Sequence, residues 1–328
     1  MGFDLDKKSN GFECFTHHSN PNRSDGAILF DKLIMRPERN RAWELIKAGD
    51  SERGFDILRD HGYYKDHLGN IIYNDGPNML FGRAVQYYCD LVLLEDQNPN
   101  EAYREAINMI QGYQSPHWRN AADEKDRIDD VVNGVYYDDQ GRKPREKEEK
   151  EKVSKTLFQL VANNALAGMQ EAMTGANQIT GEEKLEGKLE GCRLPYIGFG
   201  DYNAGTVELK TKWTDNVFDK EGNPKRLPKN YRNQVAGYWH MTGNMPKLVM
   251  ASRNGYHVYR PTAEELTNAL RLVKTACQRL EGKFDTYTTK EAVLRSCEVD
   301  FEVKFYWGDL HPRHRALAEQ IWGVADGF

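Results

Sequence analysis

The sequence lacks the features that mark membrane proteins and secreted disulfide-rich proteins. None of its apolar runs approaches the roughly 20 residues needed to cross a bilayer, and the start of the chain, Met-Gly-Phe-Asp-Leu-Asp-Lys-Lys, has no apolar core of a signal peptide. We therefore expect a cytoplasmic protein with no membrane partner. The five cysteines are odd in number and widely scattered along 328 residues, which favours buried free thiols over a disulfide framework.

An excess of positive charge is also missing. The chain has 45 Lys and Arg against 50 Asp and Glu, a net charge of −5, whereas nonspecific binding to a DNA duplex comes from cations that contact phosphates. The total charge excludes a uniformly basic surface but not a local basic groove. The length allows one large domain with insertions or two smaller domains, and we favour one elaborated domain.

The most informative stretch of the chain is Tyr196–Lys210, YIGFGDYNAGTVELK. It predicts two short strands around a turn at Asn203-Ala204-Gly205. In an ordinary hairpin with this turn, Asp201 lies opposite Glu208, and opposed Cβ atoms are roughly 4.5 to 5.5 Å apart. Two carboxylates this close repel each other, and a divalent cation with oxygen ligands relieves the repulsion. The pair therefore predicts a Mg²⁺ or Mn²⁺ site beside Lys210, which suits phosphodiester hydrolysis.

Three motifs follow each other in a fixed order. They are Gly198-Phe-Gly-Asp201, then Glu208-x-Lys210, and, 24 residues after Lys210, Gln234-x-x-x-Tyr238 on a predicted helix. This order resembles the core of the PD-(D/E)XK nucleases, in the branch that contains the RecB nuclease domain and the phage lambda-type exonucleases. A further predicted strand, Leu248 to Ser252, follows the motifs, as this fold requires, and the resemblance covers about residues 78–280.

The resemblance implies an α/β restriction-endonuclease-like fold, with a small mixed sheet flanked by helices and an N-terminal helical segment. We expect residues 1–77 to form that segment and a hairpin, residues 78–280 the nuclease core, and residues 281–328 a C-terminal extension. Apolar spacing over residues 25–48 predicts two helices, interrupted at Pro37. Towards the other end the pattern predicts a helix capped by Thr262 that ends at Leu280, a strand over Phe301–Trp307 and a helix that begins at Pro312. A charged stretch at about 114–152 has no apolar face and is predicted to be an insertion.

The function implied by the resemblance is a metal-dependent DNA nuclease, specifically an exonuclease that acts on linear DNA ends in phage-type recombination, replication or DNA degradation. Asp201, Glu208 and the Leu209 carbonyl would hold one or two Mg²⁺ or Mn²⁺ ions. Lys210 would orient the attacking water or neutralise charge in the transition state. The Gln-x-x-x-Tyr motif would position the site and the strand.

Relatives in this branch take one more metal ligand, a His or Glu, from an upstream helix, four residues after a glycine. Gly82-Arg-Ala-Val-Gln86 occupies that place here. The amide oxygen of Gln86 can bind Mg²⁺ but brings no charge, and Glu171 and Glu186 are the alternative suppliers of this ligand. The departure keeps open a second interpretation, a nuclease-like DNA-binding or scaffold protein without catalytic activity, and a third, an unrelated globular protein.

A basic stretch after the hairpin predicts contact with nucleic acid, because cations can contact phosphates while aromatic rings offer a surface for a frayed base. A solvated basic loop is the alternative interpretation. We expect DNA as the partner, and the sequence leaves open a homo-oligomer and a single-strand-binding or annealing protein. The predicted contacts are Lys225, Arg226, Lys229 and Arg232, interleaved with Tyr231 and followed by Trp239.

Two other kinds of metal centre are not expected. Some relatives carry an iron–sulfur cluster on four cysteines, three of them closely spaced, and no such spacing exists here. His17-His18 and His311-Pro-Arg-His314 have no cysteine or carboxylate partner at ligand spacing. We therefore interpret these residues as loop histidines.

Overall fold

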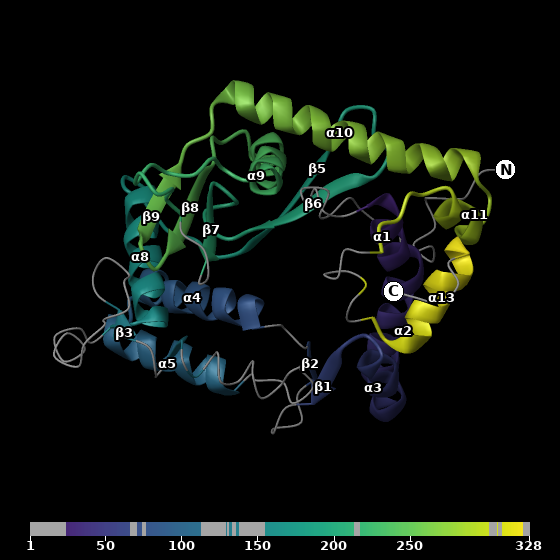
Figure 1. Ribbon diagram of the computed structural model, residues 1–328, viewed down its shortest axis with the longest axis horizontal. Helices are drawn as coiled ribbons and strands as arrows, with labels where there is room; N and C mark the ends of the chain where they lie inside the picture. Colours follow the sequence, from purple (N-terminus) through teal and green to yellow (C-terminus); the bar gives the residue numbers. More distant parts are fainter. Residues whose placement is uncertain are drawn as a thin grey trace.

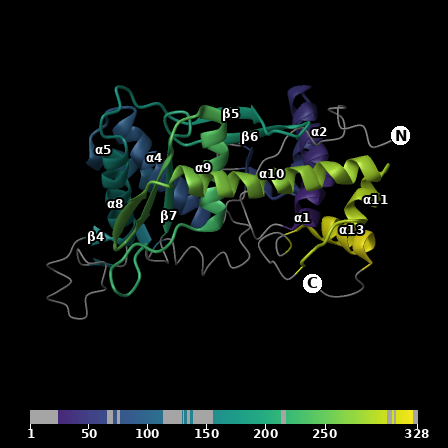
Figure 2. The ribbon, with the colours of Figure 1, turned by 90° about the horizontal axis from the view of Figure 1, so that it is seen from above.

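The computed structural model describes residues 24–65, 71–73, 77–112, 129, 131–132, 136–137, 155–212, 217–301, 307 and 310–323. Figure 1 shows two groups of elements: a small sheet with its flanking helices, and a cluster of helices drawn from both ends of the chain. The long helix α10 (Ala263–Thr286) extends from one group to the other, as the view from above also shows (Figure 2). Thr262 and Glu265 form a capping box at its start, so the predicted cap is confirmed, and the helix extends beyond its predicted end at Leu280.

The central sheet has three strands in the order β7-β8-β9. β7 (Val207–Lys212) is parallel to β8 (Lys247–Ser252), and β9 (Gly255–Tyr259) is antiparallel to β8. Parallel neighbours need a crossover connection, and helix α9 (Lys229–Thr242) lies in the segment that joins β7 to β8. The sheet is therefore mixed, and the protein belongs to the α/β class, as predicted.

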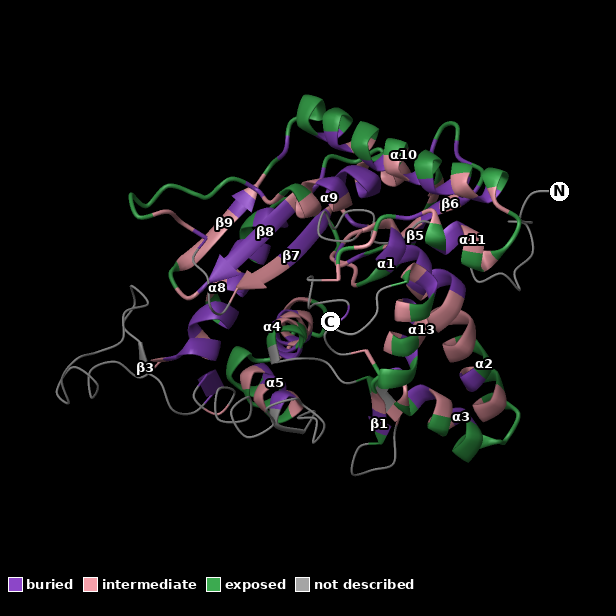
Figure 3. Ribbon diagram, turned by 45° about the vertical axis from the view of Figure 1, so that its right-hand side comes forward, coloured by how far each residue is buried: buried purple, intermediate pink, exposed green. Residues whose placement is uncertain are grey.

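Helices cover both faces of this sheet. Strand side chains alternate between the faces, so each face contributes its own set of residues to a core. Helices α4 (Pro77–Leu93), α5 (Pro99–Gly112) and α8 (Leu157–Ala172) form a hydrophobic core with one face, which contributes Val207, Leu209, Val249, Ala251 and Val258. The other face packs against α9 and α10 through Leu248 and Met250. The middle strand β8 is buried almost throughout (Figure 3).

A separate hairpin precedes the sheet. β5 (Glu183–Lys188) pairs antiparallel with β6 (Pro195–Gly200). β6 is joined to β7 by the predicted turn, in which all three residues have positive φ, 48° at Asn203, 53° at Ala204 and 73° at Gly205. Beyond this turn, pairing between the two segments is limited to one antiparallel bridge, Tyr202 with Val207. The predicted strands and turn are confirmed, but the main partner of β6 is β5.

The N-terminal helices run without a break. α1 (Asp25–Phe30), the π-helical turn η2 (Asp31–Met35) and α2 (Arg36–Lys47) follow each other directly, so the predicted interruption at Pro37 is wrong. Proline removes a hydrogen bond and crowds the carbonyl four residues earlier. Here the wider π-helical turn precedes it, and Lys290 Nζ donates to the freed Leu33 carbonyl at 3.3 Å.

The two ends of the described chain share one hydrophobic core. Phe30 of α1 lies against two tryptophan rings. Its ring centre is 5.8 Å from that of Trp307 and 5.9 Å from that of Trp322. The same core includes buried residues of α10, of α11 (Lys290–Arg295) and of α13 (Pro312–Trp322). The predicted helix from Pro312 is therefore confirmed, and α13 is packed against the N-terminal helices.

The remaining described elements are short. Helix α3 (Ser51–Arg59) is followed by the predicted hairpin of β1 (Tyr63–Lys65) and β2 (Ile71–Tyr73). β3 (Tyr136–Tyr137) pairs with β4 (Lys155–Thr156). Among the described residues no helix is long and apolar enough to cross a membrane.

Four of the five cysteines lie in the described part, and all four are buried free thiols, as predicted: Cys89, Cys192, Cys277 and Cys297. Cys14, His17 and His18 lie outside the described residues, and so do most of the charged stretch at 114–152 and most of the predicted strand at 301–307.

Candidate active site

Glu208 is the centre of a hydrogen-bonded cluster that joins β7 to α9. Its side chain is 1% exposed. Its Oε1 accepts a hydrogen bond from Gln234 Nε2 at 2.6 Å and also forms an ion pair with Lys210. Gln234 Nε2 also lies 2.7 Å from the Tyr238 hydroxyl, which donates to the Phe199 carbonyl at 2.6 Å. One chain of polar contacts therefore connects β7, α9 and the end of β6.

Asp201 joins this cluster through the backbone. It directly follows β6, and its Oδ2 accepts a hydrogen bond from the Leu209 N–H at 2.9 Å. The carboxylate of Asp201 is thereby held beside the segment that carries Glu208 and Lys210. The structure thus brings together all five residues that the sequence nominated for catalysis.

Two glycines let α9 approach β6 closely enough for this contact. A β-carbon at Gly198 would lie 2.5 Å from Cε1 of Tyr238, and one at Gly237 would lie 2.5 Å from Cε1 of Tyr196. Each tyrosine therefore packs over a glycine of the opposite element. This reciprocal packing fixes the distance of Tyr238 from β6. It thereby also fixes the position of Gln234, which lies one helical turn earlier on α9.

The turn between β6 and β7 is equally tight. A β-carbon at Gly200 would lie 2.3 Å from the Cα of Gly205. Gly205 itself has a φ of 73°, a backbone angle that residues with a side chain rarely adopt. The backbones of the two glycines are in contact, and this sets the separation between Asp201 and Glu208 on either side of the turn.

Burial and charge act in opposite directions on the ionisable groups of the cluster. Burial raises the pKa of Glu208 well above its usual range, Lys210 opposes this shift, and the negative charge of Asp201 adds to it. Burial disfavours the charge on Lys210, but the two carboxylates outweigh burial and raise the pKa of Lys210. Lys210 therefore remains a cation at neutral pH. Glu208 Oε2 is buried and has no hydrogen-bond partner among the described residues.

Gln86 lies on α4, which packs against the other face of β7. A β-carbon at Gly82, one turn before Gln86, would lie 3.4 Å from Thr211 Oγ1. Thr211 shares its strand face with Val207 and Leu209, so Glu208 projects from the opposite face. Gln86 is half-buried. The structure describes Gln86, Asp201 and Glu208, and no hydrogen bond links Gln86 to either carboxylate. The role of Gln86 as a metal ligand stays a prediction.

The two alternative ligands are engaged elsewhere. Glu171, near the end of α8, is 45% exposed and forms an ion pair with Arg260 at 2.9 Å. Glu186 on β5 is 51% exposed and pairs with Lys184 at 2.9 Å. Neither side chain takes part in the contacts at Glu208.

Asp90 is an acidic residue near this site that the sequence reasoning missed. It lies on α4 one turn after Gln86, and its Oδ1 accepts a hydrogen bond from the hydroxyl of Tyr202, the neighbour of Asp201. Burial raises the pKa of Asp90 to about 6; the hydrogen bond from Tyr202 opposes this shift, and the charge of Asp201 adds to it. The spacing Gly82, Gln86, Asp90, four residues at each step, was the signal available in the sequence.

Asp90→Asn is expected to stabilise the protein at pH 8 and to have little effect at pH 4. The folded-state pKa of Asp90 is raised above its unfolded value, so its contribution to stability is full below the unfolded pKa and is lost as the pH rises through about 6. The amide keeps an acceptor for Tyr202 and carries no charge. Denaturant unfolding should show a gain of about 1–3 kcal/mol at pH 8. An equal gain at both pH values would show that the charge of Asp90 is not the cause.

The predicted DNA-contacting residues lie in and before the first turns of α9. Lys225, Arg226 and Lys229 are exposed. Arg232 is half-buried, and its Nη1 lies 3.9 Å from a carboxylate oxygen of Glu265.

Tyr231, also in the first turn of α9, connects this stretch with the cluster. The Nζ atoms of Lys210 and Lys212 each lie 5.7 Å from the centre of its ring. Cations and an aromatic ring therefore lie next to the carboxylates.

A scan against protein-family models and searches of curated proteins and of solved structures each found no match to this chain. The function is therefore inferred from the chemistry of the residues themselves. They combine two neighbouring carboxylates, a charged lysine beside them, and a glutamine and a tyrosine that hold one carboxylate in place.

Proposed function

We propose that the protein is a metal-dependent DNA nuclease with a restriction-endonuclease-like core, and that it acts as an exonuclease on linear DNA ends in phage-type recombination, replication or DNA degradation. One observation carries the proposal. Gln234 of α9 donates to Glu208 at 2.6 Å and lies 2.7 Å from the Tyr238 hydroxyl. The Glu-x-Lys motif of β7 and the Gln-x-x-x-Tyr motif of α9 are far apart in the sequence, and their side chains meet in one site. The family resemblance implies the same meeting of the two motifs.

The acidic pair fits a hard divalent cation. Asp201 and Glu208 offer carboxylate oxygens, the ligand type that Mg²⁺ and Mn²⁺ prefer. Glu208 Oε2 is buried without a hydrogen-bond partner among the described residues, and a buried polar atom of this kind is costly to leave unpaired. Asp201, Glu208 and the Leu209 carbonyl would hold the ion.

In the proposed mechanism the protein residues fix positions and charge. A Mg²⁺ ion held by Asp201 and Glu208 would polarise the scissile phosphate and lower the pKa of an attacking water. Lys210 stays protonated because of the carboxylates beside it, and it would orient that water or neutralise charge on the phosphate. Gln234 and Tyr238 hold Glu208 in one orientation, so its carboxylate needs little reorganisation during the reaction.

DNA would approach over the first turns of α9. Lys212 and Tyr231 lie beside Lys210, and exposed Lys225, Arg226 and Lys229 extend the basic surface away from the carboxylates. The cations would contact phosphates, and the ring of Tyr231 would stack on a frayed base. This local surface is compatible with the net charge of −5, because the acidic residues can lie elsewhere.

Linear duplex DNA should be degraded progressively from its ends, whereas covalently closed circles of the same sequence should stay intact. The expectation follows from the resemblance to end-dependent exonucleases and from the fact that sequence-specific cutting would need side chains committed to base edges. Both substrates can be followed on one gel in Mg²⁺. Cutting of closed circles into discrete fragments would contradict exonuclease action.

A DNA-binding or scaffold protein without catalytic activity is the second candidate. It is favoured by the ion pair between Lys210 and Glu208 and by the absence of a hydrogen bond from Gln86 to either carboxylate. Binding of linear duplex without any loss of DNA in Mg²⁺ or Mn²⁺ would select this candidate. A protein that neither binds nor cleaves DNA would contradict both candidates.

A further inference from the structure

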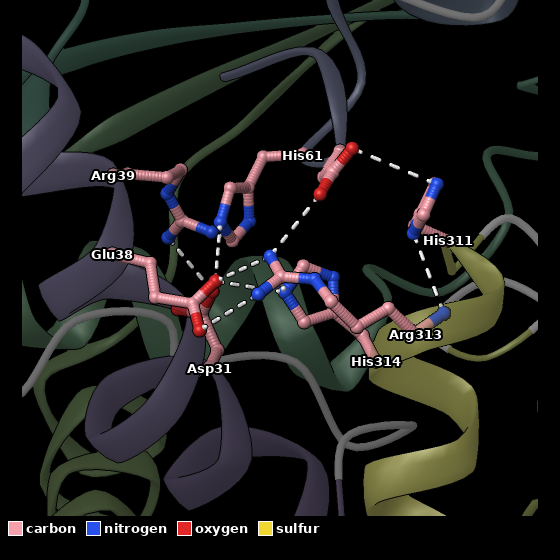
Figure 4. A network of polar contacts seen from close by, with 8 residues as sticks. Asp31, Glu38, Arg39, His61, His311, Arg313 and His314 are labelled. Carbon is pink, nitrogen blue, oxygen red and sulfur yellow. Dashed lines mark hydrogen bonds and ion pairs between the residues drawn. The ribbon is translucent and has the colours of Figure 1, made fainter. Parts of the chain in front are cut away.

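A second polar cluster lies far from Glu208, where the N-terminal helices meet α13 (Figures 1 and 4). Glu38 comes from α2, His61 follows α3, and His314 lies on α13. His314 is therefore a buried helix residue, and its interpretation as a loop histidine is wrong. The carboxylate partner that the local sequence lacked is Glu38, which is 276 residues away along the chain.

The ligand-type atoms of these residues converge on one point. His61 Nε2 lies 3.1 Å and His314 Nε2 3.0 Å from the same oxygen of Glu38, Oε2. One potential ligand atom from each residue lies within 4.8 Å of the other two. The imidazoles are 0% and 1% exposed, and their ring centres are 4.5 Å apart. The two rings are tilted by 36° to each other, and both present Nε2 to Glu38 Oε2.

The hydrogen bonding of the two histidines is incomplete. Nδ1 of His61 and Nδ1 of His314 are both buried and have no partner among the described residues. If each Nε2 donates to Glu38, as a neutral imidazole can, each Nδ1 is left as an unpaired acceptor. A neutral imidazole is also the form that binds metal ions.

We propose that Glu38, His61 and His314 form a binding site for a zinc-type divalent cation. Two imidazole nitrogens and one carboxylate oxygen are a ligand set of bound Zn²⁺, with ligand distances of about 2.0–2.2 Å. Tetrahedral ligands at that distance lie roughly 3.3 Å from each other, close to the observed separations of 3.0 and 3.1 Å. Nitrogen ligands also distinguish this site from the all-oxygen pair at Glu208, which suits Mg²⁺.

A protein cation lies against these ligands in the structure. Arg313 Nη2 lies 2.8 Å from Glu38 Oε2, 3.2 Å from His314 Nε2 and 3.3 Å from Asp60 Oδ2. Its side chain is 50% exposed, so it can turn to solvent when a metal ion takes over the charge of Glu38. Asp60, which also lies 3.6 Å from His311, would then be free to supply the fourth ligand directly or through water.

The metal would tie the beginning of the described chain to its end. Glu38 and His61 belong to the N-terminal helical region, and His314 belongs to the C-terminal helix. A cation bound by the folded protein and not by the unfolded chain increases stability by mass action. The site is therefore expected to stabilise the contact between these two regions and to leave the chemistry at Glu208 untouched.

Metal binding by the purified full chain tests the proposal. After chelator treatment and dialysis, titration calorimetry with Zn²⁺ should give one site, and Co²⁺ should give an absorption spectrum of nitrogen and oxygen ligation without a thiolate band. His314→Gln should weaken Zn²⁺ binding by at least ~10-fold. Arg313→Gln should strengthen it several-fold, because it removes the competing guanidinium. His240→Gln, at an exposed histidine of α9, is the matched control and should bind as the wild type does.

Three results would overturn the site: no Zn²⁺ binding by the wild type, equal binding by His314→Gln, or unchanged or weaker binding by Arg313→Gln. The arginine variant keeps the test decisive if His314→Gln does not fold. Arg313 is half exposed, and in a purely structural ion-pair network its loss would only lower the unfolding temperature. In the proposed site, Zn²⁺ raises the unfolding temperature of Arg313→Gln by several degrees.

Discussion

Glu208→Gln and Asp201→Asn are each expected to abolish Mg²⁺-dependent cleavage of linear DNA while the protein stays folded. Each change replaces a carboxylate by an amide of the same shape, so packing is retained and the charge that holds the cation is lost. The metal supplies several kcal/mol of transition-state stabilisation, which corresponds to a rate loss of about a thousandfold or more. Initial rates on end-labelled duplex measure the loss directly.

The matched control for these variants is Glu186→Gln. Glu186 belongs to the neighbouring strand β5, is 51% exposed and pairs with Lys184. Exposed ion pairs of this kind contribute little to stability, so the control should cleave at the wild-type rate and unfold at nearly the same temperature. Wild-type cleavage by Glu208→Gln or Asp201→Asn would remove the acidic pair from the mechanism.

Gly200→Ala is expected to have the largest effect on stability of any single methyl addition near the site. The new β-carbon would lie 2.3 Å from Gly205 Cα and 2.5 Å from Gly205 N, and both are backbone atoms that cannot turn aside. Overpacking of this kind costs about 3 kcal/mol. The turn must open to accept the methyl group, so Asp201 moves away from Glu208 and cleavage is lost as well.

Gly282→Ala provides the comparison. Gly282 is an exposed residue of α10, and a β-carbon there would meet no atom within 4 Å. Alanine is the better helix former by about 1 kcal/mol, so this variant should be as stable as the wild type or more stable. Denaturant unfolding of the two variants side by side separates the steric clash at Gly200 from a general effect of replacing glycine. Equal stabilities would show that the turn tolerates a side chain.

The sequence was sufficient to predict the parts of the site that depend on local pattern. The turn at residues 203–205, the strand with Glu208 and the helix with Gln234 each follow from alternation, turn residues or helical spacing, and each is present in the structure. Their meeting point was predictable because the order of the motifs resembled a known arrangement. The tight packing of Gly198 against Tyr238 was not predictable, because it depends on the distance between elements.

Features that depend on distant parts of the chain escaped the sequence. The predicted break at Pro37 was wrong because Pro37 lies in the first turn of α2, directly after the π-helical turn, where proline is tolerated. Lys290, more than 250 positions later, donates to the Leu33 carbonyl in this segment. His314 was interpreted as a loop residue because its partner Glu38 lies at the other end of the chain. Both contacts join α2 or its approach to the C-terminal region, and no local pattern reports such a contact.

Asp90 shows a different limit. Its position on the helix was readable, but its relation to Asp201 depends on Tyr202, whose hydroxyl reaches across from the β6–β7 turn to α4. Periodicity indicates which face of a helix is buried, whereas the strand residue opposite that face is set by packing. The same reasoning applies to Gln86, because the face of β7 that α4 would cover was not fixed by the sequence.

The central claim is that the Asp201–Glu208 pair binds a divalent cation and cleaves DNA. The most direct test is the release of acid-soluble nucleotides from linear duplex by the purified wild-type protein, measured over time with Mg²⁺ and again with excess chelator. The account predicts steady release with Mg²⁺, none with chelator, and recovery when Mg²⁺ is restored. No release under any of these conditions, or equal release in chelator, would contradict it.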